Sequence, residues 1–387
     1  MLTGLILKLM AGKLPQQGGN NMLLPVVDKL NFKVESAMGS WITDENGKRY
    51  LDFFTDVGVV SLGYKPVHCS YIHMPNHFHL QEREEAARRL CDVSGMDYCF
   101  FSNSGAESVE AMLKLARKYQ SQFGRTKIYT LKGAFHGRTY GAMSCSYMGE
   151  GHYHWDGYGP MVPDIERFDL DDLSTIDPTA AAVLITPGFL NKDYTPFDKH
   201  KVWALDNYCK ENGILFLMDE VQTYLRLGCW WGKDLYNVDP DIICTAKGVA
   251  GGIATGVTLC KKAIGDSMKK GGHFSTFGGN PLSVRGINNV LDIVERDEAF
   301  FQKIWAKGIL IKSYLKAMGW KDVQGDGLLI SAEIDPSYNM IELRDRCLEK
   351  GLIIGVFSPY GRLKLTPPLN IAYEEIDIAM EVLKRCL

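Results

Sequence analysis

The amino-acid sequence predicts an α/β protein that is built on a mostly parallel sheet. Its apolar runs are unbroken rather than alternating with polar residues, which is typical of parallel strands covered on both faces. Helix-length segments such as residues 198–213 separate these runs, and alternating strands and helices favour an α/β architecture. The runs are YCFF (98–101), KIYTL (127–131), AAAVLI directly before Thr186, ILFLM (214–218) and DIICT (241–245).

The segments around these runs complete the predicted organisation. Residues 41–53, WITDENGKRYLDF, have the strand–turn–strand pattern of a hairpin. After the first apolar run, Val109, Met112, Leu113 and Ala116 recur at helical spacing. Beyond FGGNP the pattern changes to long helices and short strands, which predicts a second, smaller α+β domain. The expected parts are an N-terminal segment that contributes to the small domain (1–45), a large domain (46–275) and a C-terminal small domain (276–387).

The composition argues against several classes of function. The chain has 387 residues, a net charge of −3 and no basic bias, so we expect neither a nucleic-acid nor a membrane partner. No run approaches the roughly 18 apolar residues of a membrane span. The ten cysteines form no CxxC pair, which argues against a metal site and favours the reducing cytoplasm. The N-terminal stretch MLTGLILKLMAGKL predicts a small amphipathic helix that docks on a partner subunit, with a signal peptide as the alternative.

Two charged residues follow apolar runs closely, where burial is costly. Ligands of open α/β sheets bind at the carboxyl ends of the strands, and Asp219 and Lys247 stand at two such ends. A lysine that is desolvated there has a lowered pKa, which an imine-forming amine needs. The aspartate suits a metal ion or a cationic ring nitrogen, since a buried carboxylate requires a partner. The structural alternatives are a lysine whose amine reaches solvent and an aspartate that caps a helix.

Smaller residues mark two other strand ends. Ser104, Gly105 and Ala106 lie between a strand and a helix, where a helix N-terminus favours an anion such as phosphate. Phe135 and His136 end the next strand, and a packed aromatic in a capped loop is their structural alternative. Pyridoxal phosphate has a phosphate, a flat ring, a ring nitrogen and an aldehyde, which suit these residues together with the aspartate and the lysine. A Rossmann nucleotide site fits less well, because no GxGxxG follows the first strand.

Five ordered motifs resemble those of the class III pyridoxal-phosphate aminotransferases, and the branch they resemble is that of the acetylornithine and ornithine aminotransferases. The resemblance runs from about residue 32 to the C-terminus and implies a fold-type-I homodimer whose active sites lie at the subunit interface. It also implies that the large domain binds the cofactor. The motifs are FSNSGAESVEAMLKLARKY (101–119), LKGAFHGRTYGAMS (131–144), LFLMDEVQT (215–223), AKGVAGGIATG (246–256) and HFSTFGGNPL (273–282).

The same resemblance implies a role for each site residue. Lys247 would form the Schiff base with the cofactor's aldehyde and then move a proton, while Asp219 would pair with the ring nitrogen. The other cofactor-binding residues would be Ser104, Gly105 and Ala106 at the phosphate, Phe135 and Val221 on the two ring faces, His136, Gln222 at the ring hydroxyl, and Thr276 at the phosphate of the other subunit. The substrate-binding residues would be Arg138, Ser275, Lys364 and Asn191.

The chain departs from the family pattern at the predicted substrate end. Thr186 and Asn191 stand where acidic residues are expected, and Lys364 replaces an arginine that clamps the carboxylate of glutamate in the family. Arg362, two residues earlier on the same strand face, could substitute for it. A lysine lacks the planar fork of arginine, so these changes put the usual glutamate/2-oxoglutarate cycle in doubt. The segment after GYKPVH (63–68) is also about ten residues shorter than usual.

These observations predict an aminotransferase that moves an amino group from an amino acid or amine to a keto acid or aldehyde. An epimerase or lyase with the same cofactor is the alternative, since such enzymes need no second substrate. A non-catalytic relative is a third hypothesis, and the intact Lys247, Asp219 and Thr276 argue against it.

Overall fold

The computed structural model describes residues 30, 32–66, 72–147, 155–187, 194–335, 338–357 and 361–387. Residues 34–387 form one compact unit, and residues 1–33 belong to another. The predicted N-terminal helix and Asn191 lie outside the described residues.

A seven-stranded sheet, the large sheet, dominates the described part of residues 34–387, with the strand order β4-β10-β9-β8-β7-β5-β6. The pairs from β9 to β6 are parallel, whereas β10 is antiparallel to both of its neighbours. The five predicted apolar runs are therefore confirmed as strands. The sequence analysis did not predict the other two strands of this sheet, β6 and β10. The strands are β4 (Tyr98–Ser102), β5 (Ile128–Leu131), β6 (Ile165–Phe168), β7 (Ala182–Ile185), β8 (Leu215–Asp219), β9 (Ile242–Thr245) and β10 (Gly256–Cys260).

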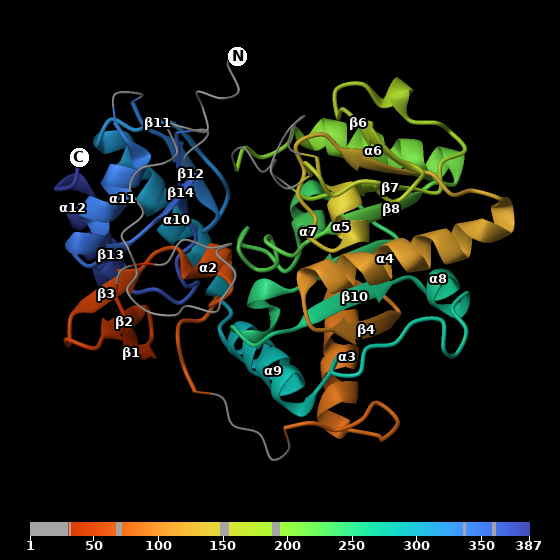
Figure 1. Cartoon of the computed structure of the whole chain (residues 1–387), viewed down its shortest axis with the longest axis horizontal. Helices are drawn as coiled ribbons and strands as arrows, with labels where there is room; N and C mark the ends of the chain where they lie inside the picture. The colour runs from red at the N-terminus through yellow and green to blue at the C-terminus, as the bar shows by residue number, and fades with distance from the viewer. Residues whose placement is uncertain are drawn as a thin grey trace. The chain divides into compact units, whose positions relative to one another are not determined.

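Helices cover both faces of the large sheet, which explains why its strands are unbroken apolar runs. Along β8, Leu215 and Leu217 pack in the same apolar cluster as Val109 and Met112 of the helix α4. The intervening Phe216 faces the other way, into the cluster of the helix α6. Figure 1 shows α4 and α6 on either side of the strands. The predicted helices are confirmed as α4 (Gly105–Gln120) and α6 (Lys199–Asn212).

Two smaller sheets lie in the same unit. One has the order β1-β2-β3-β13 and contains the predicted hairpin, while the other has the order β11-β12-β15-β14. Their strands are β1 (Val34–Met38), β2 (Trp41–Asp44), β3 (Arg49–Asp52), β11 (Lys321–Gln324), β12 (Ile330–Glu333), β13 (Leu352–Ile353), β14 (Gly355–Phe357) and β15 (Arg362–Leu365). The pairing of β13 with β3 joins segments from the two ends of the chain.

The remaining helical segments connect the sheets. They are α2 (Thr55–Gly58), α3 (Gln81–Ser94), η1 (Ser121–Phe123), α5 (Tyr140–Cys145), η2 (Leu173–Thr175), α7 (Gly232–Tyr236), η3 (Lys247–Ala250), α8 (Lys262–Asp266), α9 (Pro281–Arg296), α10 (Phe300–Ala317), α11 (Met340–Glu349) and α12 (Tyr373–Lys384). None of the helices in the described ranges is long and apolar enough to cross a membrane.

The domain limits remain predictions. The first limit, at residue 46, falls inside the hairpin that β2 and β3 form. Beyond the second limit, α9 packs against α3 and η3 of the predicted large domain (Figure 1). The chain therefore crosses between the predicted parts more often than a division at two points allows.

Candidate active site

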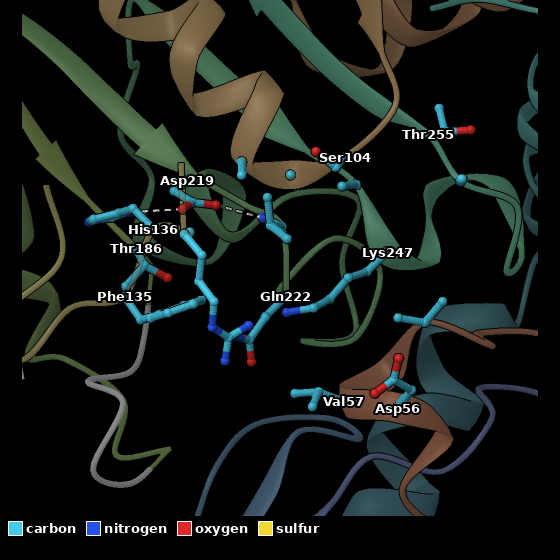
Figure 2. Close-up of a pocket in the computed structure, with 18 of the residues that line it drawn as sticks. Asp56, Val57, Ser104, Phe135, His136, Thr186, Asp219, Gln222, Lys247 and Thr255 are labelled. Carbon is cyan, nitrogen blue, oxygen red and sulfur yellow. Dashed lines mark hydrogen bonds and ion pairs between the residues drawn. The ribbon is translucent and has the colours of Figure 1, made fainter. Parts of the chain in front are cut away.

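A cavity of about 580 Å³ opens at the carboxyl ends of the large sheet's strands. One wall, the strand-end wall, comes from the segments that follow β4, β5, β7, β8 and β9. The other wall, the facing wall, comes from α2 and its neighbours and from β14 and β15 (Figure 2). The strand-end wall includes Asn103, Ser104, Gly105, Ala106, Phe135, His136, Arg138, Thr186, Asp219, Val221, Gln222, Lys247 and Thr255; the facing wall includes Phe54, Asp56, Val57, Val59, Val356, Phe357 and Lys364.

Lys247 is the first residue of η3, and its side chain points into the cavity (Figure 2). Its φ of 40° is in the left-handed region, which costs a lysine free energy and is common at functional sites. Burial lowers the pKa of its amine to about 8, although the nearby Asp219 and Asp56 carboxylates act in the opposite direction. A fraction of this amine is therefore neutral, and nucleophilic, close to neutral pH.

Asp219 ends β8 and is held by two hydrogen bonds. Its Oδ2 lies 2.8 Å from Nδ1 of the buried His136, and its Oδ1 accepts from the backbone N–H of Val221 at 3.0 Å. The His136 backbone is itself fixed, because its N–H donates to Ser146 Oγ at 2.8 Å. The arrangement fixes a carboxylate at the cavity edge, where it can hold a cationic ring nitrogen. The sequence predicted His136 at the site without a role, and the structure makes it the partner of Asp219.

The N-terminus of α4 opens onto the cavity. Ser104 caps this helix by accepting from the N–H of Glu107 at 3.2 Å. The amides of Gly105 and Ala106 lie in the first turn, where the N–H groups have no acceptor within the helix. Thr255 lines the same end of the cavity (Figure 2), and its buried Oγ1 has no hydrogen-bond partner within the described ranges. Amides at a helix start and an unpartnered hydroxyl fit a phosphate group.

Aromatic and polar side chains line the middle of the cavity. The guanidinium of Arg138 lies over the Phe135 ring, 5.2 Å from its centroid. Val221 and Gln222 line the cavity beside Asp219. Thr186 also lines it, so this departure from the family pattern lies where a bound molecule would touch it.

A strained turn forms part of the facing wall. Thr55, Asp56 and Val57 have φ values of 46°, 51° and 57°, a left-handed conformation that costs about 1–2 kcal/mol per residue. The turn is held from outside: Asp52 Oδ1 accepts from the N–H of Thr55 at 2.8 Å, and the Thr55 hydroxyl donates to the carbonyl of Thr366 at 2.6 Å. Asp56 and Val57, which follow Thr55 in this turn, line the cavity.

The buried Arg226 fixes the end of the same turn. Its guanidinium donates to the carbonyls of Gly58 at 3.1 Å, Pro367 at 2.8 Å and Leu328 at 3.3 Å. Burial lowers the pKa of Arg226 to about 10. A Cβ at Gly58 would lie 2.2 Å from Arg226 Nε, so a side chain there would displace the guanidinium. Arg226 thus joins the chain that follows β8 to both segments of the facing wall.

Lys364 lies on β15 with only 6% of its surface exposed. Its amine is 4.3 Å from the centroid of the Phe357 ring and 4.7 Å from that of Tyr194. The expectation that Arg362 could take the clamping role is wrong. Arg362 donates to Asp322 Oδ2 at 2.6 Å and to Ser331 Oγ at 2.8 Å, and it does not line the cavity.

Two predicted residues lie away from the cavity of a single chain. Thr276 is exposed, and Ser275 accepts a hydrogen bond from Asn103 Nδ2 at 3.1 Å. Neither of them lines the cavity. Their predicted roles, which involve a second subunit, remain predictions, as does the role of Asn191.

Sequence reasoning missed several residues of the cavity. Thr255 had a usable signal, because it lies within the glycine-rich motif AKGVAGGIATG (246–256) that contains Lys247. Asp56 and Val57 had no such signal, because the sequence Thr55-Asp56-Val57 contains no glycine that would predict a left-handed turn. Val356 and Phe357 reach the cavity only through the pairing of β14 with β15.

Comparisons with known proteins agree with this geometry. The family model for class III aminotransferases matches residues 25–387. The acetylornithine aminotransferase of Archaeoglobus fulgidus is 32% identical over 375 residues, which cover 93% of this chain and 97% of that protein. That of Aquifex aeolicus is 35% identical over 381 residues, with 93% and 98% covered. The ornithine aminotransferase structure from Toxoplasma gondii superimposes with a TM-score of 0.84 at 24% identity, with 93% and 90% covered, and so shows the fold.

Proposed function

We propose, from the premise that this chain belongs to the class III aminotransferases, that its amino donor is an amino acid of the ornithine type and its acceptor a keto acid or aldehyde. The chain is a pyridoxal-phosphate-dependent aminotransferase with the type I fold. The observation that carries the proposal is one cavity with the low-pKa amine of Lys247, the Asp219–His136 pair and the start of α4.

The residues of the strand-end wall fit the cofactor. The amides of Gly105 and Ala106, with the hydroxyls of Ser104 and Thr255, would hold its phosphate. Asp219 would hold its ring nitrogen, because His136 fixes this carboxylate at the cavity edge. Phe135 and Val221 would cover the ring faces, and Gln222 would take the ring hydroxyl. When bound, pyridoxal phosphate supplies an aldehyde that captures the donor's amine and a ring that withdraws electrons from the substrate carbon.

Lys247 would carry the proton transfers. Because its pKa is lowered to about 8, its Nζ alternates easily between neutral amine and ammonium near neutral pH. The neutral form would hold the cofactor through its aldehyde, and, once the donor's amine has taken its place there, the released Nζ would accept a proton from the substrate carbon. The resulting ammonium can return that proton to a neighbouring carbon. Burial of the amine therefore serves both its nucleophilic and its basic role.

Two cations would bind the carboxylate of the donor or acceptor. Arg138 can form a bidentate pair with it, and Lys364 lies on the facing wall of the same cavity. Relatives named acetylornithine aminotransferase support an ornithine-type donor. Lys364 offers a point charge instead of a planar fork, so glutamate is expected to be a poor donor.

The assembly and location complete the proposal. We propose a homodimer in the cytoplasm in which Thr276 reaches the phosphate, and Ser275 the substrate, of the other subunit. The exposure of Thr276 supports this assignment. Light scattering should give twice the mass of the 43.3 kDa chain, and a monomer with full activity would contradict the shared site.

Absorption spectroscopy of the purified holoenzyme tests the reaction. Glutamate, ornithine, acetylornithine, lysine, alanine and simple amines are added one at a time. Transamination predicts that one of them converts the aldehyde-form absorbance of the cofactor to that of the amine form. A donor that binds without this conversion, and is racemised or eliminated, would support the epimerase or lyase alternative, which the altered Thr186 and Lys364 positions favour.

A further inference from the structure

We infer that Asp56 recognises a second ammonium group on the donor, so that the enzyme prefers an amino acid with two free amines, such as ornithine, over its N-acetylated form. This inference rests on the proposed function, because it assigns the donor's second charge within the same cavity. Whichever amine of ornithine reacts, the other stays an ammonium. In acetylornithine that second nitrogen is a neutral amide.

One of the two carboxylates that line the cavity is available to a second ammonium group. The acids among its described lining residues are Asp219 and Asp56. Both oxygens of Asp219 already have partners, namely His136 and the N–H of Val221. Within the described ranges, Asp56 has no hydrogen bond and no ion pair of its own. A donor ammonium would therefore find its counter-charge at Asp56.

Asp56 is not explained as the partner of Lys247. The two side chains enter the same cavity (Figure 2), yet no ion pair joins them in the structure. An anion beside Lys247 favours the ammonium form, which opposes the neutral amine that the reaction needs. A carboxylate at this position is therefore better explained by a bound molecule than by the reactivity of Lys247.

Asp56 is open to a bound molecule. It is exposed in the single chain and lines the cavity together with Val57, Val59 and Val356, so a bound ammonium can reach its carboxylate, and a donor that covers it would strengthen the charge–charge contact by excluding water. The left-handed turn that carries Asp56 is held by Asp52 and Thr366, which lie outside the cavity. The carboxylate is thus placed in advance, so little ordering free energy is lost when a donor binds.

Two residues of opposite charge in the same cavity would define the orientation of the donor. Arg138 and Lys364 are cations of the same cavity, suited to a carboxylate, and Asp56 is the complementary anion. An amino acid with one carboxylate and two amines satisfies these groups together with Lys247. A monoamine would lack the ion pair with Asp56 and gain less binding free energy.

The test compares two donors in two variants. Asp56→Asn removes the charge and keeps the side-chain shape, and asparagine readily adopts the left-handed conformation; Asp56→Glu restores the charge. For Asp56→Asn holoenzyme, kcat/KM should fall about 10- to 100-fold with ornithine and stay unchanged or rise with N-acetylornithine. Asp56→Glu should recover part of the ornithine activity. An equal loss with both donors, or no loss with either, would overturn the inference.

Equilibrium binding separates this inference from the proposed function. In cofactor-loaded Lys247→Ala, which cannot turn over, calorimetry gives the dissociation constants of both donors with and without Asp56→Asn. The inference predicts that the second substitution weakens ornithine alone. If the wild-type enzyme aminates no acceptor from either donor, the proposed function fails, while this binding difference still supports or refutes the role of Asp56.

Discussion

The two walls of the cavity are built in different ways. The strand-end wall consists of side chains that follow strands of one sheet, and its central acid, Asp219 at the end of β8, is paired with His136, which follows β5. The facing wall combines a strained turn near the start of the chain with two strands near its end. The proposed roles of its charges, Asp56 and Lys364, concern the substrate. In the proposal the strand-end wall therefore holds the chemistry, whereas the facing wall, together with Arg138, selects the substrate.

Lys247→Ala should have the largest effect, because it removes the amine that carries the proposed nucleophilic and proton-transfer roles. We expect activity with every donor to fall by at least about 10³-fold, while the fold persists. The absorption band of the covalently attached cofactor should disappear, and circular dichroism should not change. A variant that keeps the band would show that another lysine attaches the cofactor.

Arg226→Met should break the connection between the two walls. Three buried carbonyls would lose their donor, so we expect the free energy of unfolding to fall by about 3 kcal/mol or more. Urea titration measures this loss. Arg88→Met is the matched control, since Arg88 forms exposed ion pairs on α3 and should cost less than about 1 kcal/mol. Equal losses in the two variants would contradict the bridging role.

The pH dependence of methylation at Lys247 tests the lowered pKa of its amine on the strand-end wall. Because its pKa is lowered from 10.5 to about 8, the neutral amine should appear as pH rises through 8. At pH 7 it should hold about 300 times more neutral amine than an unperturbed lysine. Reductive methylation of the cofactor-free protein, read by mass spectrometry, should give a half-maximal rate near pH 8 at Lys247. Lys127 is the control, because its ion pair with Asp177 raises the pKa of its amine; parallel profiles would contradict the prediction.

Lys364→Arg should have the smallest effect and should act on selection alone. The guanidinium can remain stacked on Phe357 and Tyr194 and offer a planar fork to a carboxylate. We expect kcat/KM for glutamate to rise up to about 10-fold. Lys307→Arg is the control, because this lysine is also buried beside an aromatic ring but lies outside the cavity. No change, or a loss, with glutamate would mean that Lys364 does not limit glutamate use.

The sequence predicted the strand-end wall far better than the facing wall, for a physical reason. Asp219 and Lys247 follow buried apolar runs, and the ends of parallel strands necessarily meet at one edge of a sheet. Asp56 depends on a backbone conformation that bonds to Thr366 impose, more than 300 residues away. The error at Arg362 arose because strand alternation gives the face of a side chain, whereas its direction was set by Asp322 and Ser331.

The dependence of the 55–57 turn on Thr366 has a consequence for how the protein is made. Thr55 leaves the ribosome 311 residues before Thr366, whose carbonyl accepts its hydroxyl hydrogen bond. The turn has an unfavourable intrinsic conformation, so a nascent chain has little reason to hold it. The strands of the large sheet are complete by residue 260 and can pair sooner. The ability to choose a substrate should therefore arise during synthesis only after the large sheet has formed.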